Sequence, residues 1–151
     1  MKDKTYLKSD SISVNTFGEL TFLWKKIWLR EQIIYHLFGP NDLLIDTIQK
    51  IAFDNKIKKA VVLSFIGSAK KVSLSNLKDS KDKPEKSQIS LEGTFEIISM
   101  TGHIIPVTGD KIRVHMHITL AKEDGSVFGG HLDEAILYTG GYLFLKVLEQ
   151  F

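Results

Sequence analysis

Hydrophobic and polar positions alternate along much of the chain, a pattern typical of β-strands with one buried face. The clearest case is segment 112–120, where five apolar residues alternate with four polar ones. Other runs that predict strands are 33–38, 60–66, 69–74, 89–92, 94–101, 132–138 and 142–148. Residues 60–66 are almost uniformly apolar, which predicts a central strand buried on both faces. Gly67-Ser68 is expected to end that strand before the next one begins.

One segment has helical periodicity instead. Apolar residues recur three and four positions apart at Leu44, Ile45, Ile48, Ile51 and Ala52. With Asn41 or Asp42 as N-cap, this spacing predicts a helix over about 42–54. Residues 76–88 are charged and contain Pro84, which predicts a surface loop. The expected fold class is α+β, a compact single domain of mostly antiparallel or mixed β-sheet with one clear helix.

The first thirty residues are harder to interpret. Residues 1–16 are polar and predict a loose segment or a short edge strand. Trp24 and Trp28 lie four positions apart in the apolar segment 20–29, a spacing that suits one side of a helix and one face of a strand equally. Both indoles are expected in the core or at a subunit interface.

Composition narrows the possible functions. Cysteine is absent, so a metal would be held by nitrogen and oxygen atoms. The net charge is +2, and Arg30 and Arg113 are the only arginines among twenty basic residues. Because base readout favours arginine, strong sequence-specific DNA binding by this chain alone is not expected. No apolar run reaches the roughly 18 residues of a membrane span. No signal-peptide core is present, so we expect a cytoplasmic protein without a membrane partner.

The polar face of segment 112–120 carries candidate chemistry. Its members are Arg113, His115, His117 and Thr119. The two imidazoles lie one strand repeat apart, about 7 Å between Cα atoms, and His131 follows a diglycine further along the chain. Three neutral imidazoles with an open fourth position suit a divalent metal. We predict His115, His117 and His131 as ligands of zinc, although nickel or iron also suits such a site. The alternative is three half-buried histidines bonded to the backbone or to each other.

Four further residues are candidates around this site. Gly129 and Gly130 permit close backbone approach and would shape it. Glu96, among apolar neighbours, is either a partner for an imidazole N–H, an acid of raised pKa, or one half of an edge salt bridge with a lysine. Arg113 is a candidate for lining a substrate pocket. His36 and His103 have no partner at ligand spacing and are interpreted as ordinary histidines.

Several motifs together resemble one family. Residues 92–102 resemble the Gly-Arg-Phe-Glu-Ile-Leu-Ser-Leu-(Ser/Thr)-Gly signature of the PPC domain, the "plants and prokaryotes conserved" domain. His115-x-His117, Leu120-Ala121, Asp124-Gly125 and the segment 129–132 continue that pattern in order, and residues 60–68 resemble an upstream family segment. The similarity runs from about residue 31 to 149. It predicts an N-terminal extension over 1–30 and a PPC-like domain over 31–151.

The resemblance implies a compact α+β domain that forms a homotrimer. Plant members carry an AT-hook, an Arg-Gly-Arg element that enters the DNA minor groove. Single-domain prokaryotic members are provisionally assigned to DNA binding, and some contain metal. This chain has no Arg-Gly-Arg, so the plant mode of DNA contact does not carry over. Thr94 stands where the signature has arginine, so the partner-docking role of that motif does not carry over either.

Two functions from different classes remain. The first is a non-enzymatic homotrimeric module that binds DNA or a regulatory protein, with a metal organising its site. The second is a zinc-dependent lyase or hydrolase acting on a small oxo acid, because acetolactate decarboxylase looks similar and holds zinc through a His-x-His and a later His. The first is favoured, since Glu96 is the only acid–base candidate. An enzyme is expected to show a substrate-sized pocket lined by Glu96 or Arg113, and a docking module a closed or shallow site.

Overall fold

The computed structural model describes residues 5–7, 12–14, 19–22, 25–28, 32–109 and 111–151. The chain divides into two compact units, Met1–Glu31 and Gln32–Phe151. In the described part of the chain, no helix has the length and hydropathy needed to cross a membrane.

The first unit contains a small antiparallel sheet. Its strands, in the order in which they pair, are β1 (Thr5–Leu7), β2 (Ile12–Val14), β3 (Glu19–Phe22) and β4 (Lys25–Trp28). The described residues of segment 20–29 are therefore strands and not a helix. Trp28 ends β4, and Trp24 lies outside the described residues.

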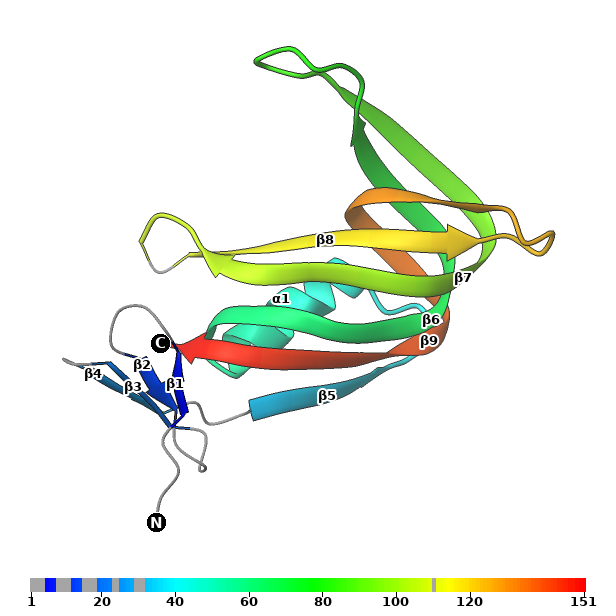
Figure 1. Cartoon of the computed structure of the whole chain (residues 1–151). Helices are drawn as coiled ribbons and strands as arrows, with labels where there is room; N and C mark the ends of the chain where they lie inside the picture. The colour runs from blue at the N-terminus through cyan, green and yellow to red at the C-terminus, as the bar shows by residue number, and fades with distance from the viewer. Residues whose placement is uncertain (1–4, 8–11, 15–18, 23–24, 29–31, 110) are drawn as a thin grey trace. The chain divides into compact units, whose positions relative to one another are not determined.

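The second unit is an antiparallel sheet with one helix among its described residues, as the α+β prediction requires (Figure 1). Its elements are β5 (Gln32–Phe38), α1 (Leu44–Asp54), β6 (Ile57–Leu77), β7 (Lys86–Pro106), β8 (Ile112–Ala121) and β9 (Val127–Gln150). The sheet order is β5-β9-β6-β7-β8. β8 also pairs with β9. The four longest strands, β6, β7, β8 and β9, therefore form a closed ring in which each strand pairs with two others.

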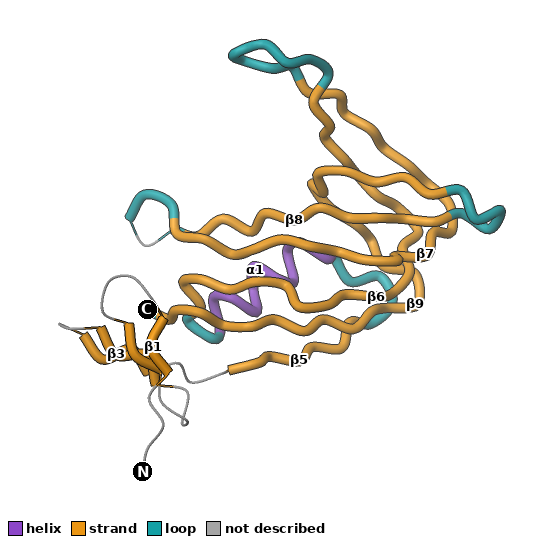
Figure 2. The backbone as a smooth tube through the Cα atoms, viewed as in Figure 1, coloured by secondary structure: helices purple, strands orange, loops and turns teal. Residues whose placement is uncertain are grey.

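The helix packs against the sheet (Figure 2). Its Leu44 and Ile48 are fully buried in one core with Ile57, Met116 and Leu145 of the strands. Burial of each such side chain contributes roughly 1.5–3 kcal/mol. The remaining members of that core come from every strand of the unit, so the helix and the sheet share one hydrophobic interior.

The predicted N-cap is wrong. The N-cap residue is Leu43, and its side chain makes no capping hydrogen bond. Glu134 on β9 caps the helix instead, its carboxylate accepting hydrogen bonds from the backbone N–H groups of Ile45 (2.8 Å) and Asp46 (3.2 Å). Asp42 accepts a hydrogen bond from the Gly39 N–H at 2.7 Å and so stabilises the preceding turn.

Several predicted strands are parts of longer ones, and the predicted break at Gly67-Ser68 is wrong. β6 continues through Gly67, which pairs with Ile97 and with Gly141. A Cβ at Gly67 would lie 2.5 Å from the Gly140 carbonyl oxygen, so this glycine permits close strand approach rather than a turn. The loop predicted over 76–88 is confined to 78–85, because β6 continues to Leu77 and β7 begins at Lys86.

Burial of residues 60–66 on both faces is also wrong. Ala60 and Phe65 are buried, whereas Leu63 and Ile66 are about half exposed, at 51% and 53%. One face of β6 is therefore an apolar surface that the unit itself leaves uncovered.

Candidate metal centre

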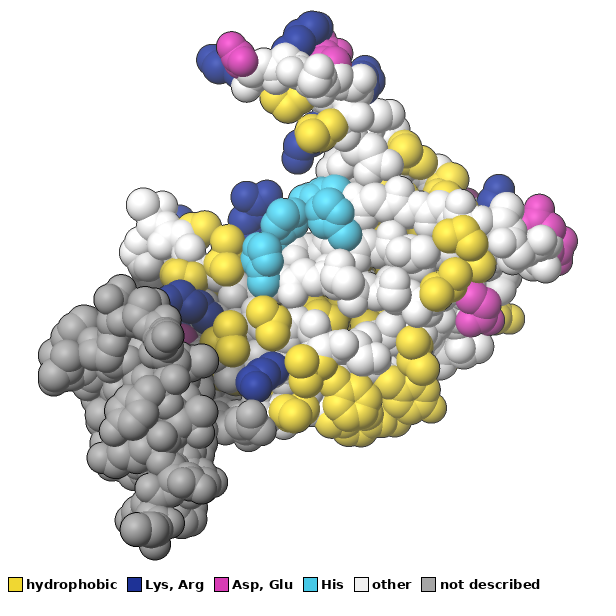
Figure 3. Space-filling view, in the orientation of Figure 1, with side chains coloured by type: hydrophobic (Ala, Val, Ile, Leu, Met, Phe, Trp, Pro, Cys, Tyr) yellow, Lys and Arg dark blue, Asp and Glu magenta, His cyan; other side chains and the backbone are white. Residues whose placement is uncertain are grey.

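The three predicted ligands lie together on the outer face of β8 and β9. Met116, Ile118 and Leu120 are buried, so the alternation read from the sequence is confirmed and the histidines of β8 point outward. The register places His117 opposite His131. One ligand atom from each of His115, His117 and His131 lies within 4.8 Å of the others. Imidazoles form a continuous patch on this face (Figure 3).

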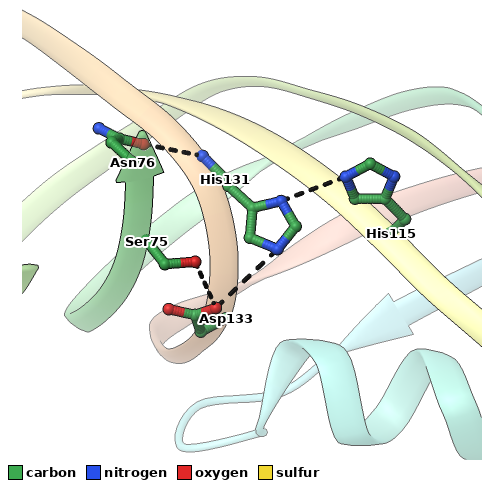
Figure 4. A network of polar contacts seen from close by, with 5 residues as sticks. All are labelled: Ser75, Asn76, His115, His131 and Asp133. Atoms are coloured by element: carbon green, nitrogen blue, oxygen red, sulfur yellow. Dashed lines mark hydrogen bonds and ion pairs between the residues drawn. The ribbon is translucent and has the colours of Figure 1, made fainter. Parts of the chain in front are cut away.

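Two of these imidazoles are already in contact. The His115 Nε2 and His131 Nδ1 atoms are 3.1 Å apart and share a hydrogen bond (Figure 4). Tetrahedral zinc with Zn–N bonds of 2.0–2.1 Å places its nitrogens about 3.4 Å apart. The distance between the His115 and His131 nitrogens is therefore close to the separation of two nitrogen ligands in a tetrahedral zinc site. His117 is exposed, so its side chain can rotate to bring its nitrogen nearer. The donor set fits a divalent transition metal.

The surroundings of His115 and His131 lower the pKa of each and so favour the neutral imidazole, which is the form that binds metals. Burial lowers the pKa of His115, and the neighbouring His131 and Arg113 lower it further. Burial also lowers the pKa of His131, with Lys86 the next largest cause and Asp133 acting in the opposite direction. Both groups therefore carry their lone pairs at neutral pH.

A carboxylate stands behind His131, and sequence reasoning missed it. Asp133 Oδ1 lies 3.9 Å from His131 Nε2 and accepts a hydrogen bond of 2.9 Å from the buried Ser75 hydroxyl (Figure 4). If Nδ1 binds a metal, Nε2–H faces this carboxylate, the usual orienting partner of a metal-bound imidazole. The sequence did contain a sign of this contact. Asp133 follows His131 by two positions, and residues two apart in a strand lie on the same face.

The diglycine allows β6 to hold the strand that carries His131. Asn76 Oδ1 accepts a hydrogen bond from the His131 backbone N–H at 3.2 Å, and Asn76 Nδ2 donates one to the Gly129 carbonyl at 3.3 Å. A Cβ would lie 1.9 Å from Asn76 Oδ1 at Gly130 and 2.0 Å from the Ile118 oxygen at Gly129. Both positions accept only glycine.

His103 extends the imidazole cluster. It pairs with His115 across β7 and β8, and the two rings meet edge-on with centroids 5.1 Å apart. Its ring is not one of the three whose ligand atoms converge. The sequence spacing gave no sign of this neighbour, because the contact depends on the register of the β7–β8 pair.

The structure does not bring Glu96 to the histidines. It pairs with Ser68 and Ala121, five residues along β7 from Thr101, which is the partner of His117. At about 3.3 Å per residue, that separation is roughly 16 Å along the strand. Glu96 lines a different hollow of about 510 Å³, together with Ser68, Thr94 and Tyr142.

A second, polar hollow of about 330 Å³ borders His117. Its walls include the hydroxyl-bearing residues Ser99, Thr101 and Thr119 and the diglycine, together with the apolar Ile118 and Phe128. The hollow contains neither Glu96 nor another carboxylate among its lining residues. The imidazole of His117 is thus the titratable side chain that lines this hollow.

This combination defines a class of protein, a compact antiparallel domain that carries a histidine cluster suited to a metal on an outer strand face. A model of the Plants and Prokaryotes Conserved (PCC) domain, abbreviated PPC elsewhere, matches residues 31–149, and the chain belongs to this family. A curated relative, AT-hook motif nuclear-localized protein 4 of Arabidopsis thaliana, is 30% identical over 118 residues. That match covers 72% of this chain but only 27% of the plant protein.

Three solved structures show the same fold. A PPC protein from Pyrococcus horikoshii is 25% identical with a TM-score of 0.68, covering 79% of this chain and 80% of its own. A metal-containing protein from Archaeoglobus fulgidus is 24% identical with a TM-score of 0.68, covering 79% and 81%. A protein from Bacteroides thetaiotaomicron, provisionally named as DNA-binding, is 15% identical with a TM-score of 0.69, covering 99% and 86%.

Proposed function

We propose that this PPC domain binds a divalent metal ion, zinc, through His115, His117 and His131. The observation that carries the proposal is the convergence of three ligand nitrogens within 4.8 Å on one strand face. The carboxylate of Asp133 supports it, as do the two hydrogen bonds between the Asn76 side chain and the backbone of Gly129 and His131, hereafter the Asn76 clamp. Metal-bound imidazoles are usually fixed by such partners. The metal-containing relative of similar fold points in the same direction.

Metal analysis of the purified protein tests this proposal. The unaltered chain is expected to retain about one equivalent of zinc per chain after dialysis, and the His117→Ala variant is expected to lose it. His36→Ala is the matched control, because His36 lies on β5 and its ring packs against Phe38, away from the cluster. Zinc content that is equal in the unaltered chain and the His117→Ala variant would overturn the proposal.

We propose further that the domain assembles as a homotrimer through the uncovered apolar face. Tyr35 and Phe144 lie 5.0 Å apart between ring centroids, and with Ile66 and Tyr142 they line a hollow of about 570 Å³. Hydrophobic side chains gather over β5 and β9 in Figure 3. Contiguous apolar patches on soluble domains are typical of protein interfaces.

Light scattering after size exclusion tests the assembly. A mass of three chains is expected for the unaltered protein, and Tyr142→Glu is expected to yield monomers because it buries a charge in the interface. Phe53→Glu is the control, since Phe53 is 83% exposed at the end of α1. A monomeric unaltered chain at micromolar concentration would contradict the proposal.

In this assembly the domain would act as a DNA-binding or regulatory module rather than as an enzyme. Lysines supply most of the positive charge, so DNA would be held mainly by lysine–phosphate contacts. Affinity for a duplex is therefore expected to fall steeply between about 50 and 200 mM salt, which fluorescence anisotropy measures directly. Absence of any salt-sensitive binding would leave a regulatory protein as the partner.

A further inference from the structure

Two cationic side chains lie beside the histidine cluster, and neither is one of its three proposed metal ligands. Arg113 stands two residues before His115 on β8, on the same outward face. Lys86 begins β7 opposite Leu77, the residue after the Asn76 that clamps His131. Arg113 and His115 are one strand repeat apart, roughly 7 Å between Cα atoms. Neither makes an ion pair with a carboxylate among the described residues.

The charges around the site do not balance once a metal is bound. Three neutral imidazoles leave both charges of a divalent ion uncompensated. Arg113 and Lys86 add one positive charge each. Asp133 is the carboxylate that the described residues bring next to the imidazoles, and its Oδ1 already accepts the Ser75 hydroxyl. A site with this excess of positive charge attracts an anion.

We infer that the ligand of this site is a small oxyanion, a carboxylate or a phosphate, held by the Arg113 guanidinium beside the open metal position. The inference rests on the proposed metal site and adds the chemical class of what that site binds. A guanidinium presents paired N–H donors that match the two oxygens of a carboxylate or phosphate. Lys86 contributes a point charge without that directional fit.

The adjoining hollow limits the size and polarity of the ligand. Its volume of about 330 Å³ is at the lower end of the range for small-molecule sites. Ser99, Thr101 and Thr119 line it with hydroxyl groups that donate to oxygen atoms. Arg113 does not line this hollow, so the hollow would accept the short polar remainder of the ligand rather than the anionic group that Arg113 holds.

Cobalt substitution provides a direct test, because the visible spectrum of Co²⁺ reports a new ligand at an open position. Inorganic phosphate, malonate and a short DNA duplex are titrated separately into the cobalt-loaded full chain. Saturable spectral change is expected, and Arg113→Gln is expected to weaken it by about 10-fold or more while cobalt affinity stays within about 2-fold. Arg113→Lys should retain part of the affinity and Lys86→Gln should lose less. Lys50→Gln, on the exposed side of α1, is the control and should match the unaltered chain.

The outcomes separate this inference from the metal site. A response to the small anions assigns a free oxyanion, and a response to the duplex alone assigns a backbone phosphate. Cobalt binding with no response to any probe, or a response that Arg113→Gln leaves unchanged, overturns the oxyanion inference and leaves the metal site standing. Failure of the unaltered chain to bind cobalt overturns the metal site and this inference with it.

Discussion

Asn76 on β6 accepts a hydrogen bond from the backbone N–H of His131 on β9, at 3.2 Å. These residues are 55 positions apart in the sequence, and the clamp forms only because Gly130 has no side chain. The position of one candidate ligand therefore depends on a strand that contributes no ligand itself.

Gly130→Ala tests that dependence. The new methyl group would lie 1.9 Å from Asn76 Oδ1, so the Asn76 side chain must move and its hydrogen bonds are lost, and the positive φ of 154° also disfavours alanine. We expect a loss of roughly 1–3 kcal/mol in the free energy of unfolding. Metal affinity should fall about 10-fold or more, as it does when supporting contacts of a metal site are lost. Denaturant titration and competition with a chelator measure the two effects.

The control for this variant is Gly39→Ala. A Cβ there meets Asp42 at an ordinary 3.7 Å, so neither stability nor metal affinity should change much. Equal metal affinities for Gly130→Ala and Gly39→Ala would show that the clamp does not position His131.

Asp133→Asn removes the negative charge behind His131 while keeping the shape of the side chain. The carboxylate orients the imidazole and raises its basicity, so zinc affinity should fall about 10- to 100-fold. Asp54→Asn, at the end of α1, should leave zinc affinity unchanged. Chelator competition at fixed pH measures both variants. An unaltered affinity in Asp133→Asn would mean that the 3.9 Å separation from His131 persists in the loaded site.

The sequence predicted the strand face of His115 and His117 correctly because alternation with period two is a local property. The edge-on contact of His103 with His115 was not accessible in the same way, since it depends on the register between β7 and β8. The site-supporting role of Ser75 likewise needs the pairing of β6 with β9. Local patterns thus predict which face a residue occupies, whereas register decides which residue it meets.

The cap of α1 illustrates the same limit. Asn41 and Asp42 precede the helix and have favourable cap chemistry, yet a carboxylate from far along the chain takes the position. Nothing in the local sequence distinguishes Glu134 from other strand carboxylates. The strand alternation of β9 and its bridge from Leu43 to Ile136 bring it to the helix start.

Glu134→Ala should therefore destabilise the domain. Two backbone N–H groups at the start of α1, those of Ile45 and Asp46, lose their acceptor, and the loss of a helix cap costs about 0.5–2 kcal/mol. Glu123→Ala, an exposed residue in the β8–β9 turn, is the control and should be nearly neutral. Urea unfolding followed by circular dichroism compares the two. Equal midpoints would show that water satisfies these N–H groups as well as the carboxylate does.

The ion pairs of Glu149 make stability depend on pH. Its carboxylate contacts Lys58 Nζ at 2.8 Å and Lys59 Nζ at 2.6 Å, and hydrogen bonds from these lysines lower the pKa of Glu149 from 4.5 to about 2. The folded chain thus holds this group ionised where the unfolded chain protonates it. The stabilisation is complete above pH 4.5 and is lost as the pH falls from 4.5 toward 2.

Glu149→Gln is expected to lower the free energy of unfolding by a small, constant amount between pH 6 and 8, because the pair is exposed and screened by solvent. The difference from the unaltered chain should shrink as the pH falls below 4.5, where the unfolded unaltered chain takes up a proton. Urea titrations at pH 7, 4 and 3, with Glu123→Gln as control, measure the trend. A difference that grows on acidification would have the wrong sign and would exclude Glu149 as the source of this pH dependence.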